Sequence, residues 1–148
     1  MLNIGVGRGV LEATLVKKGG VVMMSEVLEH LADDVLTATL VEARRVLKPG
    51  GHFVGTVPAD ENLPDNRVMC PHCGGPFHRW GHLQSFNEER LGALLAQQLD
   101  NVALSRHFFG DIRTLNWKGR ISRLVKQILV RFGVTGNGET FFFSACKL

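Results

Sequence analysis

The sequence predicts an α/β fold with a mainly parallel sheet, and three features indicate it. Short apolar segments alternate with amphipathic helical segments along the 148 residues, which is the pattern of strands joined by crossover helices. A glycine-rich turn follows the first predicted strand, and paired glycines end the helices before the next two strands. Such strands are buried beneath helices on both faces of the sheet.

The first predicted strand is residues 2–4. The glycine-rich turn GVGRG follows it at residues 5–9, and an amphipathic helix extends from there to the glycines at 19 and 20. The turn on its own is a weak signal, because a tight turn can need glycine without binding anything.

The next unit begins with an apolar strand at residues 21–24. The strand leads into the segment SEVLEHL (25–31), and a longer helix starts at Asp33 or Asp34. Its apolar positions recur at helical spacing until the sequence Lys-Pro-Gly-Gly (48–51) ends it.

The second half of the chain contains three more predicted strands and two helices. A long irregular insertion follows the first of these strands, because no strand or helix pattern is present in it. Asn87 is the predicted cap of the next helix, with glutamates in its first turn. The strands are residues 52–58, 102–109 and 139–147, the insertion is residues 59–84, and a basic amphipathic helix is expected over about 118–132.

The composition is that of one globular domain, residues 1–148. Hydrophobic residues make up 45% of the chain and charged residues 21%, which suffices for a single core. The net charge of +3 is too small to indicate that contacts to phosphate define the function. No apolar run approaches the roughly 18 residues of a membrane span and no signal peptide is recognisable, so we expect a cytoplasmic protein.

Four segments in this order resemble the class I S-adenosylmethionine-dependent methyltransferases (type 11-like): GVGRG, SEVLEHL, RVLKPGG before a strand, and TVP closing that strand. The resemblance covers most of the chain. It implies a Rossmann-like methyltransferase sheet, mainly parallel with an antiparallel last strand. It also implies that Gly5, Gly7 and Gly9 form the turn beneath the methionine part of S-adenosylmethionine, and that Glu26 lies near the cofactor.

Two departures from the family pattern concern the cofactor site. Asn3 stands where the family usually has Asp, and only residues 10–20 lie where the family usually has two further βα units. The missing stretch normally supplies the acidic residue that binds the ribose hydroxyls. The sheet would therefore be truncated at one edge, with the remaining five strands still contiguous, and a non-catalytic remnant of the fold is the main alternative to an enzyme.

Placed on a helix, Glu26, Glu29 and His30 would share one face. Carboxylate and imidazole ligands on one face suit Mg²⁺, Mn²⁺ or Zn²⁺, although glutamates in a first turn also stabilise the helix dipole without a metal. The motif Glu-x-x-Glu-His resembles that of the small-RNA 3′-terminal 2′-O-methyltransferases and the ubiquinone-pathway O-methyltransferases. In the RNA enzymes a further histidine follows the next strand, and His82 is the matching candidate here, with His78 second.

The insertion offers a competing metal site. Cys70, Cys73, His78 and His82 could hold Zn²⁺, although the spacing between the second cysteine and the first histidine is shorter than in a classical zinc finger. Cysteines without a metal and a redox pair are the other interpretations. The two metal sites compete for His82, which we assign to the site with Glu29 and His30.

The function that follows from the resemblance is methyl transfer from S-adenosylmethionine to an oxygen of a small-molecule or carbohydrate-like acceptor. A bound cation would orient the acceptor and lower the pKa of its hydroxyl, or His30 or His82 would act as a general base without a metal. A metal-dependent RNA ribose O-methyltransferase is a second alternative. The basic helix leaves contact with nucleic acid open, although such helices are more often simply solvated.

Overall fold

The computed structural model describes residues 2–4, 20–107 and 138–148, together with the helical positions 117, 121, 122, 125 and 128. The predicted glycine-rich turn, the predicted helix that follows it up to residue 19 and most of the basic helix lie outside the described residues. The elements are β1 (Leu2–Ile4), β2 (Val21–Ser25), the short 3₁₀ helix η2 (Leu28–His30), α2 (Asp33–Val46), β3 (His52–Pro58), the 3₁₀ helix η3 (Leu63–Asn66), β4 (Arg67–Met69), β5 (Pro76–His78), α3 (Glu88–Ala96), β6 (Asp100–His107) and β7 (Thr140–Cys146).

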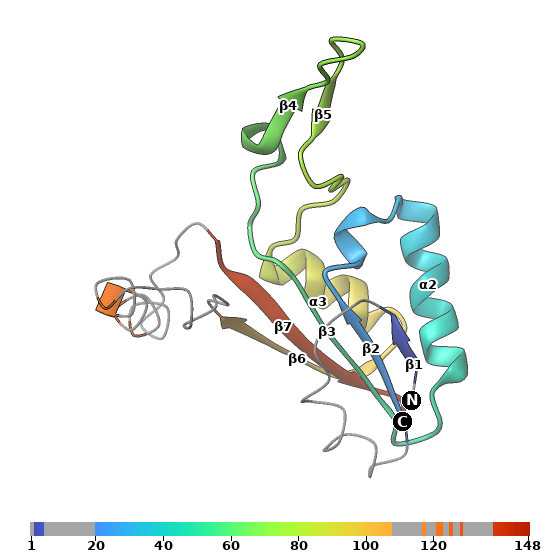
Figure 1. The fold of residues 1–148 in the computed structure, drawn as a ribbon. Coiled ribbons are helices and arrows are strands. Elements are labelled where there is room, and N and C mark those ends of the chain that lie inside the picture. Colours follow the sequence, from blue (N-terminus) through green and yellow to red (C-terminus); the bar gives the residue numbers. More distant parts are fainter. Residues whose placement is uncertain are drawn as a thin grey trace.

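The main sheet confirms the predicted fold class. Its strand order is β1-β2-β3-β7-β6. β1, β2 and β3 are mutually parallel, whereas β7 is antiparallel to both β3 and β6. The last strand is therefore the antiparallel one, and among the described strands β1 forms one edge of a contiguous five-stranded sheet (Figure 1).

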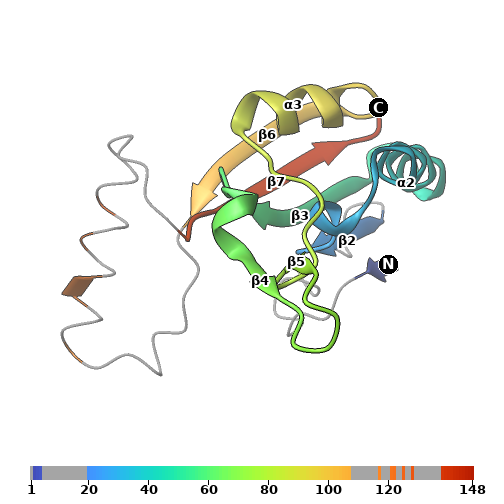
Figure 2. The same ribbon diagram turned by 90° about the horizontal axis from the view of Figure 1, so that it is seen from above.

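Both described helices of regular length, α2 and α3, lie on the same face of this sheet (Figure 2). One hydrophobic core joins that face to the two helices, which contribute leucines spaced three and four residues apart. The side chain of Asn87 caps α3 by accepting a hydrogen bond from the backbone N–H of Arg90 at 2.7 Å, as the sequence predicted. The largest fully buried core side chains are Phe53, Phe86, Phe141, Phe143, Leu28, Leu40, Leu91 and Leu95.

The segment SEVLEHL does not form the helix that the sequence suggested. Ser25 ends β2, and Glu26 adopts a left-handed backbone conformation with φ of 54°. Only Leu28–His30 is helical, as a single 3₁₀ turn. The backbone N–H of Glu26 instead donates to the carbonyl of Thr56 in β3 at 2.9 Å, so the chain stays bonded to the sheet two residues beyond the strand end expected at residue 24.

The insertion is partly ordered by a two-stranded antiparallel hairpin, β4 and β5, which projects beyond the carboxyl ends of β2 and β3 (Figure 1). Its outer side chains include exposed hydrophobic ones, among them Met69 and Phe77. Within the described part of the chain, no helix is long and apolar enough to cross a membrane.

Candidate metal and acceptor site

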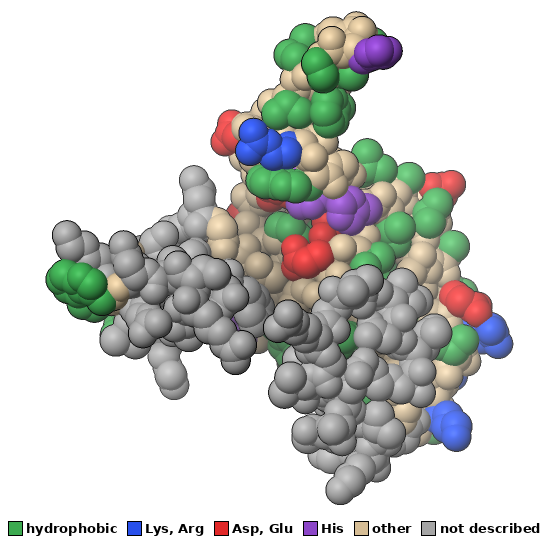
Figure 3. Space-filling model, in the orientation of Figure 1, with side chains coloured by type: hydrophobic (Ala, Val, Ile, Leu, Met, Phe, Trp, Pro, Cys, Tyr) green, Lys and Arg blue, Asp and Glu red, His purple; other side chains and the backbone are tan. Residues whose placement is uncertain are grey.

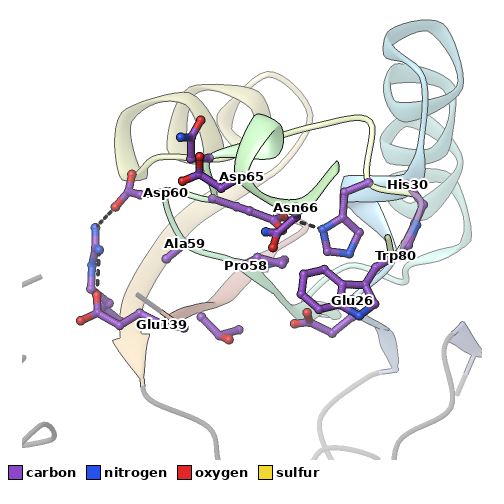
Figure 4. A pocket seen from close by; sticks show the side chains of 15 residues that line it. Glu26, His30, Pro58, Ala59, Asp60, Asp65, Asn66, Trp80 and Glu139 are labelled. Carbon is purple, nitrogen blue, oxygen red and sulfur yellow. Dashed lines mark hydrogen bonds and ion pairs between the residues drawn. The ribbon is translucent and has the colours of Figure 1, made fainter. Parts of the chain in front are cut away.

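A cavity of about 1030 Å³ opens at the carboxyl ends of the parallel strands, where ligands bind in open α/β sheets. Histidine and acidic side chains gather there at the base of the hairpin (Figure 3). Glu26, His30 and Trp80 lie at one end of the cavity, and Asp60 and Glu139 lie at the other (Figure 4).

Glu29 is the most unusual residue near this cavity. Its side chain is fully buried, and neither carboxylate oxygen has a hydrogen-bond partner among the described residues. The pKa of Glu29 is raised from 4.5 to about 7, mainly by burial; the nearby N–H of its own backbone lowers the pKa, and the carboxylates of Glu26 and Glu61 add to the rise. A buried carboxyl group without a partner is costly, so its retention calls for an explanation.

Backbone hydrogen bonds bring His82 to Glu29 across more than fifty residues of sequence. The backbone N–H groups of Leu83 and Gln84 both donate to the carbonyl of Glu29, at 2.7 and 2.9 Å. The Gln84 side chain then donates to the carbonyl of Leu31. These hydrogen bonds hold the segment after the hairpin against η2. The rings of His30 and His82 contact each other edge to face, with centroids 4.8 Å apart.

The environment of His30 determines which ring nitrogen is free. Its Nδ1 lies 3.2 Å from the carbonyl oxygen of Gly81, which can only accept, so Nδ1 carries the hydrogen in the neutral ring. Its Nε2 keeps a lone pair and lies 3.8 Å from Oε1 of Glu29.

Glu29, His30 and His82 each place one potential ligand atom within 4.8 Å of the others. Three of the four residues predicted for the metal site therefore converge, including the one drawn from the insertion. Glu26 lines the same cavity but is not a member of this group. The two buried carboxylate oxygens without partners are what a cation-binding site requires, so these residues fit a metal ion.

The proposed cysteine site is arranged differently. Cys70 and Cys73 occupy the turn between β4 and β5, whereas His78 lies where β5 ends, next to His82 and Glu61. Two groups of potential ligands converge among the described residues, and neither contains a cysteine. Within the turn, backbone N–H groups of Cys73 and His72 lower the pKa of the Cys70 thiol.

Glu61 and Arg106 are two site residues that the sequence reasoning missed. Glu61 contacts both His78 and His82, and Arg106 forms ion pairs with Asp60 at 2.7 Å and Glu139 at 2.9 Å. Asp60 and Glu61 follow Ala59, just after the strand that ends at Pro58. Acidic residues at the carboxyl end of a predicted parallel strand are the signal that could have identified Glu61.

Comparison with known families supports the fold assignment. The family model described as "Methyltransferase domain" matches residues 12–103, which is more than half of the chain. The chain belongs to this methyltransferase domain family. No curated protein sequence matches it significantly.

Solved structures resemble this methyltransferase domain in fold. A SAM-dependent methyltransferase from Archaeoglobus fulgidus superimposes with a TM-score of 0.51 at 15% identity, covering 90% of this chain and 63% of that one. A chain from the complex between the Haloferax volcanii Trm112 methyltransferase activator and a methyltransferase gives 0.51 at 17% identity, covering 88% and 56%. The chain thus spans less than two thirds of the length of these structures.

Proposed function

We propose that this chain is an S-adenosylmethionine-dependent methyltransferase that methylates an oxygen of a small-molecule or carbohydrate-like acceptor, with a cation held by Glu29, His30 and His82. The observation that carries the metal proposal is the buried Glu29 carboxyl group, whose two oxygens have no partner among the described residues and lie beside two imidazole rings. S-adenosylmethionine supplies an activated methyl group, so the protein's main task is positioning.

The donor set indicates the kind of ion. Two imidazole nitrogens and one carboxylate suit Zn²⁺ or Mn²⁺ better than Mg²⁺, which prefers oxygen ligands and retains several waters. Such an ion would lower the pKa of a bound hydroxyl. Without an ion, His30 is the accessible base, because its side chain is 39% exposed and Nε2 is free to accept a proton.

The walls of the cavity favour a neutral or hydroxyl-rich acceptor over RNA. Carboxylate side chains predominate among the described charged residues of the cavity, and a negatively charged wall repels a phosphate backbone. Trp80 is 53% exposed at one end and offers an apolar plane against which a sugar ring could pack. Among the described residues, the acidic ones that line the cavity are Glu26, Asp60, Glu61, Asp65 and Glu139, and the only lysine or arginine is Arg106.

The cofactor part of the proposal rests on the family resemblance. Gly5, Gly7 and Gly9 are proposed to contact S-adenosylmethionine, with Glu26 at the border between cofactor and acceptor. Isothermal titration of the full chain with S-adenosylmethionine tests this, and we expect binding. No heat of binding at millimolar ligand would contradict the enzyme and favour the remnant of the fold, whereas RNA binding that weakens steeply with salt would favour the RNA alternative.

Elemental analysis separates the two metal sites. We expect about one equivalent of metal in the wild type, loss of that metal in Glu29→Gln, and retention in Cys73→Ser. Loss in Cys73→Ser with retention in Glu29→Gln would instead support the cysteine site. Glu26→Gln, tested in parallel, shows whether Glu26 is a fourth ligand. The three cysteines are free, and because thiols stay reduced in the cytoplasm, we propose that the enzyme acts there.

A further inference from the structure

Glu61 lies between two histidines at the base of the hairpin. Its Oε2 is 2.5 Å from Nδ1 of His82, and its Oε1 is 3.4 Å from Nε2 of His78. The Asn66 side-chain amide also donates to Oε1, at 2.8 Å. All three members of this histidine and glutamate group have side chains that are at most 10% exposed, so their hydrogen bonds compete little with water.

The ligand atoms of Glu61, His78 and His82 converge within 4.8 Å, which raises the question of a second metal site. The tautomer of His78 argues against one. The backbone N–H of His82 donates to Nδ1 of His78 at 3.1 Å, so Nδ1 is the bare nitrogen and neutral His78 carries its hydrogen on Nε2. His78 Nε2 lies 3.4 Å from Oε1 of Glu61 without a hydrogen bond to it, and a cation bound to this nitrogen would require the opposite tautomer.

His82 is held in the opposite tautomer to His78 by its contact with Glu61. The carboxylate of Glu61 can only accept, so Nδ1 of His82 carries the hydrogen that lies between them. Nε2 of His82 then keeps its lone pair and is the nitrogen available to a cation. His30 is held in the same tautomer by Gly81, and its Nε2 lies 3.8 Å from Oε1 of Glu29, so we expect Nε2 to be the ligand atom of both imidazoles.

We propose that Glu61 is a positioning residue that fixes His82 in the Nδ1–H tautomer and thereby prepares Nε2 to bind the metal held by Glu29 and His30. The inference deepens the proposed function and rests on it for the metal. Carboxylate groups behind metal-ligating histidines commonly play this part, and their removal typically weakens metal binding about 10- to 100-fold.

Nitrogen NMR of the imidazole rings tests the tautomer directly and needs neither metal nor activity. In chelator-treated protein at about pH 8, above the ordinary imidazole pKa near 6.5, we expect His82 to show a protonated Nδ1 and a bare Nε2. In Glu61→Leu, which keeps the bulk of the side chain but removes the acceptor, we expect the proton to shift toward Nε2. His82→Gln assigns the signals, and a wild-type His82 with its proton on Nε2 would overturn the proposal.

Calorimetric titration with Zn²⁺ tests the consequence for binding. Glu61→Leu should bind Zn²⁺ about 10- to 100-fold more weakly than the wild type. Asp65→Asn is the matched control, because it removes one negative charge from the same cavity and leaves the Glu61 carboxylate in place. If Zn²⁺ binding were weakened equally in Glu61→Leu and Asp65→Asn, the loss of one negative charge would explain the weaker binding, and the positioning role of Glu61 would be overturned.

The two measurements distinguish failure of this inference from failure of the proposed function. Wild-type protein that shows the Nδ1–H tautomer, loses it in Glu61→Leu and yet binds no Zn²⁺ would support the positioning of His82 and contradict the metal site. If the wild type bound Zn²⁺ through Glu29 and folded Glu61→Leu bound it equally tightly, the metal site would be supported and the positioning role of Glu61 would be contradicted. The far-ultraviolet circular dichroism of each variant confirms that it is folded.

Discussion

Glu29 is a carboxyl group held where water cannot solvate it, and this accounts for the direction of its pKa shift. The nearby carboxylates of Glu26 and Glu61 repel a negative charge on Glu29 and so add to the cost of its ionisation. A cation between Glu29, His30 and His82 would offset that cost. The residue therefore links stability to pH in the metal-free protein.

The free energy of unfolding should carry this signature. The pKa of Glu29 is raised from 4.5 to about 7, so the folded state retains a proton that the unfolded state releases, and stability is lost as the pH rises from about 4.5 to 7. The full loss is about 3 kcal/mol. In chelator-treated protein, Glu29→Gln should therefore be more stable than the wild type at about pH 8 by roughly that amount, and similar to it near pH 4.5.

Urea unfolding at several pH values measures this difference. Glu42→Gln is the control, because Glu42 is exposed on α2 and its replacement leaves Glu29 intact. Parallel pH profiles for wild type and Glu29→Gln would show that Glu29 does not ionise as described. Added Zn²⁺ should stabilise the wild type and leave Glu29→Gln nearly unchanged.

At the scale of single elements, β3 depends on a glycine at its centre. Gly55 is paired with Met24 of β2 on one side and with Phe143 of β7 on the other. A Cβ atom at this position would lie 1.8 Å from the Met24 carbonyl oxygen and 2.5 Å from Cζ of Phe143. The strands can approach as they do only because residue 55 has no side chain.

We expect Gly55→Ala to lower the free energy of unfolding by about 3 kcal/mol or more, because the clash is with backbone of a central strand. Gly92→Ala is the matched control. Gly92 lies inside α3, and its added Cβ would meet Leu104 Cδ1 at an ordinary 3.6 Å. That substitution should raise stability by up to about 1 kcal/mol through helix propensity. Equal effects of the two substitutions in urea unfolding would contradict the packing described for β3.

The start of α3 depends on Asn87, which accepts the hydrogen bond from Arg90 N–H. Asn87→Ala should cost about 1 kcal/mol of stability, since one N–H of the first turn loses its partner. Asn87→Asp retains an acceptor and should recover most of the loss. Thermal unfolding of the three proteins decides this, and an alanine variant as stable as the wild type would argue against the cap.

At the scale of the whole molecule, Arg106 connects the end of β6 to two other segments that border the cavity. It pairs with Asp60 after β3 and Glu139 before β7, and its guanidinium lies 4.7 Å from the ring centre of Phe141. The Glu139 side chain is only 3% exposed. This arrangement holds the cavity wall opposite His30 against the sheet.

Arg106→Leu should destabilise the chain by about 2–3 kcal/mol, because the buried Glu139 carboxylate loses its ion pair with Arg106. This value lies below the roughly 3–5 kcal/mol typical of breaking a fully buried pair, because Arg106 is 20% exposed and Asp60 is 45% exposed. Arg45→Leu breaks an ion pair on the surface of α2 and should have little effect. If Arg106→Leu lowered the free energy of unfolding as little as Arg45→Leu in chemical denaturation, the ion pairs of Arg106 would not stabilise this wall of the cavity.

Much of the fold was predictable because it depends on local patterns. The strand at 52–58, the cap at Asn87 and the helix starting at Asp33 are each encoded by neighbouring residues that favour one structure. The strand order followed from the family resemblance. The conformation of SEVLEHL was mispredicted, because a hydrogen bond from Glu26 to β3 outweighed the helical spacing of its glutamates.

The sequence by itself determined the alternation of strands and helices, the family, and the identity of three residues that converge at the candidate metal site. Only the tertiary structure decided how they meet. His82 reaches Glu29 through backbone hydrogen bonds between segments more than fifty residues apart, and Glu61 becomes relevant only once β3 places it beside His82. The physical reason is that residue type and spacing specify local conformation, whereas ligand geometry and tautomer depend on contacts between segments distant in the sequence.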